Sequence, residues 1–210
     1  MRNAVFRECR LIWIFRRSAV FIMILAPVIF YLLPYARSLR GVTELESEIL
    51  AASGLFGTTA YMIFYIVYEV MKCERESKSL EMAAAFGGIG KVVCAKSAAA
   101  AGTGLLCALS FYALSCLLWG RNDLFSASLL GINAANALIY AFFAVSLLCL
   151  SDGMAVYFVI ASFPAVCLTI GLIGENKITA LFLLAEAAAA FAAREMLKKQ
   201  MERGKAGWLK

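Results

Sequence analysis

The stretch that decides the fold class runs from Val92 to Leu118 and reads VVCAKSAAAAGTGLLCALSFYALSCLL. A helix needs about 20 mostly apolar residues to cross the roughly 30 Å hydrocarbon core of a bilayer, so this run is long enough for one transmembrane helix. Similar apolar blocks recur along the chain, and the six predicted spans cover residues 18–35, 51–70, 92–118, 125–150, 154–173 and 178–193. The sequence therefore predicts an all-α integral membrane protein with six transmembrane helices.

The composition supports a membrane environment. Of the 210 residues, 63% are hydrophobic and 16% are charged, whereas a soluble domain has roughly half apolar and a quarter charged residues. No linker or soluble domain interrupts the apolar blocks, so we interpret residues 1–210 as a single transmembrane domain.

Residues 1–17 are predicted to form an amphipathic helix that lies along the membrane surface. One face of this helix is apolar and carries Val5, Phe6, Cys9, Ile12 and Trp13. The other face is polar and carries Asn3, Arg7, Arg10 and Arg17. A signal peptide is the alternative, but no A-x-A cleavage site follows the first apolar block.

The 20 Lys and Arg residues predict the orientation. With six spans and a cytoplasmic N-terminus, 16 of them fall on the cytoplasmic side and 4 fall outside, as the positive-inside rule requires. We therefore expect both ends in the cytoplasm, and we attribute the net charge of +6 to orientation rather than to nucleic-acid binding. We expect a multi-pass protein of the cell membrane, which in a bacterium is the cytoplasmic membrane.

Several classes of site are excluded by the residues that are missing. The chain has no histidine, which removes the Ser-His and Cys-His nucleophile pairs and the usual zinc and haem ligands. Its seven cysteines have no metal-ligand spacing, so we expect no metal and no disulfide. A GxxxxGK[ST] phosphate loop is absent as well. We expect no catalytic residues and no cofactor bound by this chain, and any ATP must be handled by a partner.

The most informative polar segment follows the second predicted span and reads ERESKSLEM over residues 74–82. Glu74 and Lys78 are spaced i,i+4 in the favourable order for a helix. Gly87-Gly88-Ile89-Gly90 then interrupts the helix before the third span. The segment is predicted to form a short cytoplasmic amphipathic helix. The alternative is a solvated loop whose mixed charge keeps it in water.

The basic amphipathic N-terminal helix, the six spans and the acidic E-x-E-x-x-x-L-E segment closed by a Gly-rich turn resemble the ABC-2 type transporter permeases, the membrane subunits of ABC exporters. In that family the segment after span two forms the coupling helix, which docks on a cytoplasmic ATPase subunit. The resemblance implies an ATPase-coupling element made of Glu74, Glu76, Lys78, Leu80 and Glu81.

The resemblance also implies partners and a function. The partners would be a cytoplasmic ABC ATPase, which binds the ATP and Mg, and a second permease subunit, identical or a sister chain, beside it in the lipid bilayer. This chain would be a transport subunit and not an enzyme. Because the connection between the last two spans, residues 174–177, is very short, a small hydrophobic or peptide-like cargo is expected.

An alternative function rests on Glu186, near the middle of the sixth predicted span. A charged side chain at this depth costs about 2.5 to 3.5 kcal/mol on insertion scales, so it needs a partner, a proton or water. Asn133 and Asn136 share a helix face at i,i+3, and we expect them to line a translocation path with Glu186. The chain would then be an ion-coupled secondary transporter or channel. A purely structural hydrogen bond by Glu186 remains the third interpretation.

Overall fold

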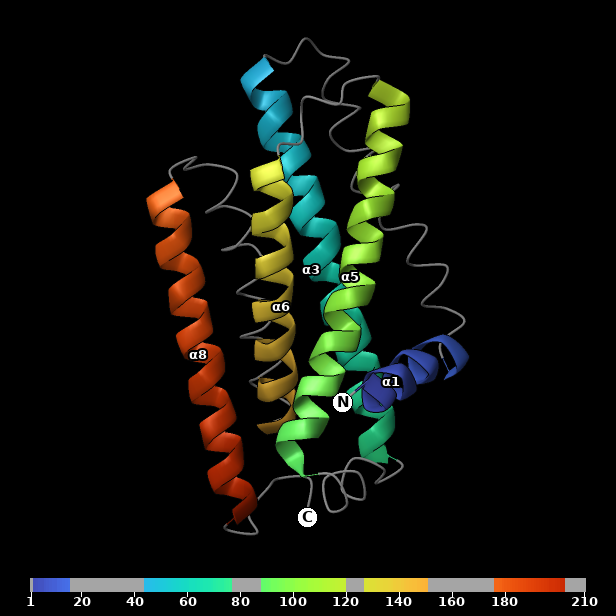
Figure 1. Cartoon of the computed structure of the whole chain (residues 1–210), viewed down its shortest axis with the longest axis vertical. Helices are drawn as coiled ribbons and strands as arrows, with labels where there is room; N and C mark the ends of the chain where they lie inside the picture. Colours follow the sequence, from blue (N-terminus) through green and yellow to red (C-terminus); the bar gives the residue numbers. More distant parts are fainter. Residues whose placement is uncertain (1, 16–43, 77–87, 120–126, 151–175, 203–210) are drawn as a thin grey trace.

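The computed structural model describes residues 2–15, 44–76, 88–119, 127–150 and 176–202, and the secondary structure in these ranges is helical throughout (Figure 1). The helices are α1 (Arg2–Phe15), α3 (Glu44–Glu76), α5 (Ile89–Trp119), α6 (Ala127–Leu150) and α8 (Asn176–Glu202). The predicted all-helical fold is confirmed for this part of the chain. The predicted first and fifth spans, residues 18–35 and 154–173, lie outside the described residues.

Three of the described helices are long and apolar enough to cross a membrane. Their apolar segments are Gly54–Glu74 of α3, Ile89–Leu114 of α5 and Ala127–Leu150 of α6, and they coincide with the second, third and fourth predicted spans. Helix α8 contains the predicted sixth span. Its membrane crossing, the total of six spans and the orientation of the chain all stay predictions.

Helices α3 and α5 extend beyond their predicted spans. With 33 residues, α3 is about 50 Å long, well above the roughly 30 Å of the hydrocarbon core. Residues 44–50, which precede the second predicted span, are the first turns of α3. Helix α5 begins directly after Gly88, whose φ of 75° favours glycine. The Gly88 carbonyl accepts hydrogen bonds from the amides of Lys91 and Val92, at 3.1 and 3.3 Å.

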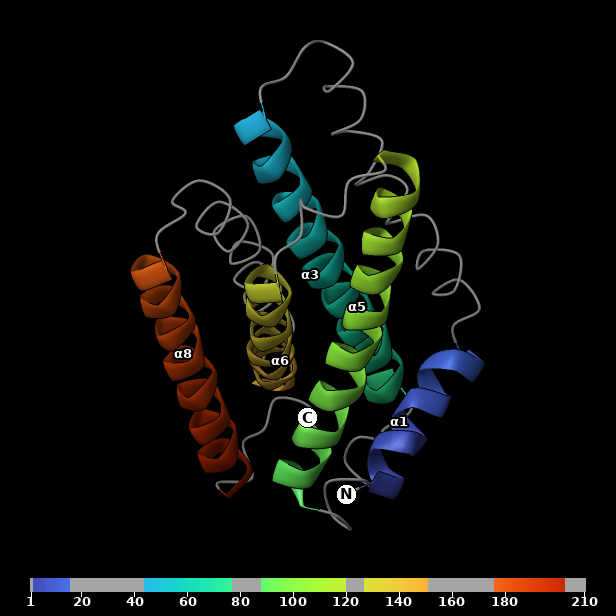
Figure 2. The ribbon, with the colours of Figure 1, turned by 45° about the horizontal axis from the view of Figure 1, so that its top comes forward.

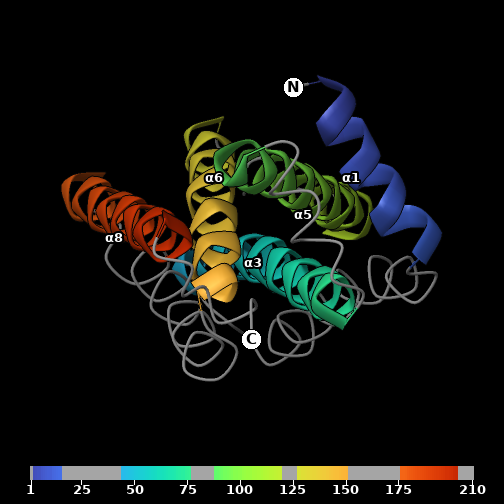
Figure 3. The ribbon, with the colours of Figure 1, turned by 90° about the horizontal axis from the view of Figure 1, so that it is seen from below.

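The helices form a bundle in which α6 is central. Helices α3, α6 and α8 run in the same direction, and α5 runs in the opposite one (Figures 1 and 2). Seen along the bundle, α6 lies between α8 on one side and α3 and α5 on the other (Figure 3). Helix α1 packs against α5 near the end of the bundle where α3 ends and α5 begins. We call this end the base of the bundle.

Small residues allow α3 and α5 to approach closely. A Cβ atom added at Gly104 would lie 2.6 Å from Ile63 Cγ1, and one added at Gly54 would lie 2.5 Å from Phe111 Cζ. Close backbone approach of this kind is typical of helix pairs in lipid, where van der Waals packing drives association. These close contacts favour one position of α3 along α5.

Several hydroxyl groups of α3 and α5 donate within their own helix, whereas the buried Ser146 hydroxyl of α6 has no hydrogen-bond partner among the described residues. Thr58 and Thr59 donate to the carbonyls of Gly54 and Leu55, both at 2.8 Å. In α5, Ser97 donates to the Val93 carbonyl at 2.8 Å. This back-bonding to residue i−4 lets polar side chains sit in an apolar bundle without an unpaired donor.

Candidate functional site

A buried group of charged side chains lies at the base of the bundle, where α1, α3 and α5 meet. Lys96 Nζ of α5 is 2.8 Å from Glu8 Oε2 of α1 and 2.5 Å from Glu74 Oε1 of α3. The exposed fractions are 5% for Lys96, 2% for Glu8 and 14% for Glu74. Arg7, which is 56% exposed, lies 2.7 Å from the other oxygen of Glu8. We call these four residues the basal charge cluster.

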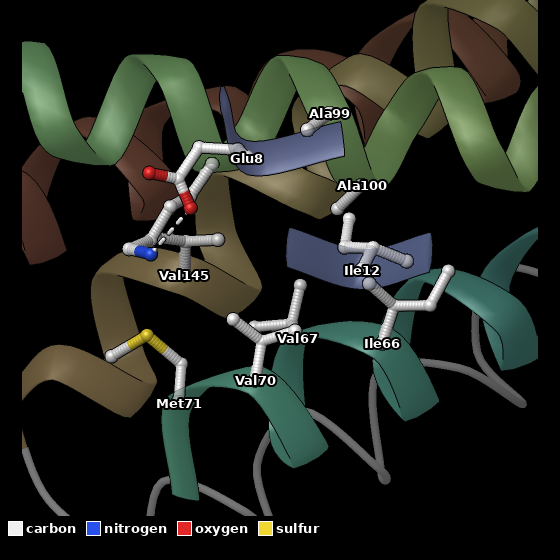
Figure 4. A pocket seen from close by; sticks show the side chains of 10 residues that line it. Glu8, Ile12, Ile66, Val67, Val70, Met71, Ala99, Ala100 and Val145 are labelled. Atoms are coloured by element: carbon white, nitrogen blue, oxygen red, sulfur yellow. Dashed lines mark hydrogen bonds and ion pairs between the residues drawn. The ribbon is translucent and has the colours of Figure 1, made fainter. Parts of the chain in front are cut away.

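The positions of these residues explain how three helices reach one point. Lys96 is two turns inside α5, about 10 Å from its first residue, and Glu74 is near the last residue of α3. Glu8 is carried by α1, which is held against the bundle by Ile12 one turn further on. Figure 4 shows Glu8 and its ion pair at a mainly apolar pocket. Ile12, Val67 and Val145 are among the residues that line this pocket.

The cluster contains two cations and two carboxylates, so its charges balance. A buried ion pair is costly to desolvate, and it is tolerated only when each charge finds partners with good geometry. Lys96 meets this condition by bridging two carboxylates. The arrangement fixes α1, α3 and α5 relative to one another, because moving any one helix would leave a buried charge without its partner.

The structure describes part of the predicted ATPase-coupling element. Glu74 belongs to the basal charge cluster and points toward Lys96, so it is not a freely solvated docking residue. Glu76 is the last residue of α3. Lys78, Leu80 and Glu81 lie outside the described residues. The structure therefore shows the helix that leads into the element, and the docking role stays a prediction.

Sequence reasoning missed Glu8 and Lys96. It counted Lys96 among the flanking cytoplasmic charges, whereas the structure buries it inside an apolar segment of α5. Among the described side chains of α1, Glu8 and Ile12 are buried against the bundle, and Phe6, predicted on the apolar face with Ile12, is 71% exposed. Two signals were present. Lys96 interrupts an apolar run, and Glu8 shares a helix face with Val5 and Ile12.

The residues predicted to line a path are all buried. Asn133 on α6 donates from Nδ2 to Thr59 Oγ1 of α3 at 3.0 Å. The Oδ1 atoms of Asn133 and Asn136 and both carboxylate oxygens of Glu186 have no hydrogen-bond partner among the described residues. Asn133 is thus joined to α3, and no described hydrogen bond joins either asparagine to Glu186.

The part of the chain that the structure describes contains no group of three or more His, Cys, Asp or Glu side chains arranged to hold a metal ion. Six cysteines in that part form no disulfide: Cys9, Cys73, Cys94, Cys107, Cys116 and Cys149.

Comparisons with protein-family models, with curated proteins and with solved structures found no match.

Proposed function

We propose that this chain is the membrane permease subunit of an ABC exporter, driven by a separate cytoplasmic ATPase. The observation that carries the proposal is the position of the acidic segment. It begins at the end of α3, at the base of the bundle, where the basal charge cluster ties α3 to α1 and α5. A force applied to residues 77–87 would act directly on the ends of α3 and α5.

The direction of the described helices supports the six-span arrangement. The last residue of α6 and the first residue of α8 lie at opposite ends of the bundle, as do α1 and the first residue of α3 (Figure 1). The ends that each connection must join are therefore separated by about the length of the bundle, which fits predicted spans over residues 18–35 and 154–173. An even number of crossings would leave both termini in the cytoplasm.

In the proposed mechanism, the ATPase changes the equilibrium between two arrangements of a pair of permease subunits. A partner shifts such an equilibrium only if it contacts the two states differently. The acidic segment, with Glu76, Lys78, Leu80 and Glu81, would provide these contacts, and α3 and α5 would carry the displacement into the membrane. The cargo would be small and hydrophobic or peptide-like, because residues 174–177 leave little extracellular loop.

Charge reversal in the acidic segment tests the proposal. The variant Glu76→Lys/Glu81→Lys, co-expressed with an ATPase encoded beside this chain, is expected to lose co-purification of the ATPase and to lose export. Glu48→Lys is the matched control, because Glu48 lies near the other end of α3, and it should retain both. If the double variant retains both ATPase association and export, the coupling assignment is wrong.

A second candidate function is favoured by one observation at Glu186. This carboxylate is 8% exposed, and both its oxygens lack hydrogen-bond partners among the described residues. A carboxylate in this setting fits the proton- or cation-coupling group of a secondary transporter. Uptake driven by a proton gradient, in vesicles without ATP, should then be lost in Glu186→Gln. The half-exposed Glu195 on the same helix provides the control Glu195→Gln.

A further inference from the structure

An apolar groove of about 370 Å³ runs between α5 and α8 over the surface of α6. Helices α5 and α8 lie on two sides of α6 in both Figure 1 and Figure 3. The groove is lined mainly by apolar side chains: Cys94 and Ala98 of α5, Leu138, Ile139 and Phe142 of α6, and Ala187, Ala190 and Phe191 of α8. Ser97 also lines it, but its hydroxyl is already bonded to the Val93 carbonyl.

A group of basic side chains lies one or two helical turns from the groove residues, toward the base of the bundle. On α8, Ala187, Phe191, Arg194 and Lys198 follow one another at three- or four-residue spacing, so they share a helix face. On α5, Lys91 precedes Cys94 by three residues and shares its face in the same way. A Cβ added at Gly90 would lie 3.8 Å from Arg194 Nη2, so these ends of α5 and α8 lie side by side.

These basic residues are available to bind an anion. Lys91 and Lys198 are exposed and Arg194 is partly exposed, and no described carboxylate forms an ion pair with any of the three. Lys91 is two residues from Ile89, the first residue of the apolar segment of α5, and Arg194 lies beside Gly90 at the same end of that segment. In a membrane this is the depth of the lipid headgroups.

We propose that this groove is a binding site for an anionic phospholipid of the bilayer. One acyl chain lies along the apolar groove, and the headgroup phosphate binds the Arg194 guanidinium together with the Lys91 and Lys198 ammonium groups. Arginine suits this role because its planar group can donate two parallel hydrogen bonds to phosphate oxygens. Basic pockets between transmembrane helices on the cytoplasmic side bind anionic headgroups in this way. The inference needs a membrane-spanning chain but does not depend on the proposed ATPase.

An anionic lipid is chosen because the site combines an apolar groove with a group of basic residues. A soluble phosphate compound would use the basic residues but would leave the apolar groove empty. A zwitterionic lipid would fill the groove, but its own positive charge would oppose the three cations. Only a ligand with an acyl chain and a net negative headgroup matches both.

The test uses the purified full-length chain and two lipids with identical acyl chains, phosphatidylglycerol and phosphatidylcholine. Native mass spectrometry counts the lipid molecules that each variant retains during titration. Phosphatidylglycerol should bind more tightly, and Arg194→Gln should weaken its binding about fivefold, as expected for one basic residue at a membrane surface. Arg194→Lys should retain most of the affinity. Lys199→Gln is the matched control, because Lys199 is exposed next to Lys198 but is turned away from the groove face.

A second pair of variants tests the groove itself. Ala187→Phe fills the groove and should reduce retention of both lipids, whereas Ala188→Phe adds the same ring on the exposed side of α8 and should not. Equal binding of the two lipids, or equal losses in Arg194→Gln and Lys199→Gln, would overturn the proposal. If millimolar inorganic phosphate displaces bound lipid as strongly as added phosphatidylglycerol does, the basic residues form a simple anion site instead. A dimer that Ala187→Phe converts to a monomer would make the groove an interface between copies.

Discussion

Replacing Lys96 with Met should destabilise the chain more than any other single loss of a basic residue in the described helices. At 2.8 Å and an effective dielectric constant of about 20, the attraction between Lys96 and Glu8 is about 6 kcal/mol. Desolvation of the two groups offsets much of this, so the pair itself adds little net stability. Removing only the lysine takes the shared cation from two carboxylates and leaves Glu8 with the largely exposed Arg7, and breaking a buried ion pair in this way typically costs about 3–5 kcal/mol.

Reversible unfolding of the purified chain in mixed micelles would measure this loss as a change in the free energy of unfolding. Lys72→Met is the matched control, because Lys72 is exposed on α3 close to Glu74 and should change stability by less than about 0.5 kcal/mol. Glu8→Gln should cost less than Lys96→Met, about 1–3 kcal/mol, because Lys96 keeps Glu74. If Lys96→Met is as well tolerated as Lys72→Met, the basal charge cluster does not hold the helices together.

Two further matched pairs test the packing of the bundle by the same unfolding measurement. Gly104→Ala places a methyl group against α3 and should lower the free energy of unfolding by about 1–3 kcal/mol. In Gly102→Ala the new methyl group meets no atom within 4 Å, so this variant should be neutral or stabilising by up to about 1 kcal/mol. Equal effects of the two variants would contradict the close contact of α3 and α5. Asn133→Leu removes the hydrogen bond to Thr59 and should cost about 1 kcal/mol, whereas Asn136→Leu removes an oxygen with no described partner and should cost less. The reverse order for the two asparagines would show that Asn136 is the bonded residue.

Much of the fold follows from local properties of the sequence. The apolar runs predict α5 and α6 within a few residues of their observed bounds, because burial in lipid depends on composition over a window of about 20 residues. The glycine-rich run over residues 87–90 predicted a break before the third span, and α5 begins within this run, at Ile89, directly after Gly88 with its positive φ. The first turns of α3 lie outside the predicted second span because Glu44, Glu46 and Glu48 lower the local hydropathy, although the helix itself continues through them.

The basal charge cluster, unlike the helices, does not follow from local sequence, and only the tertiary structure reveals it. Lys96 is 88 residues from Glu8 and 22 residues from Glu74 along the chain. No helical period connects positions so far apart, because their contact depends on the angle at which α1 crosses α5 and on the register of α3 against α5. That register is set by close contacts such as Gly104 against Ile63. The sequence by itself determined which segments are helical and apolar, and helix packing decided which buried charges meet.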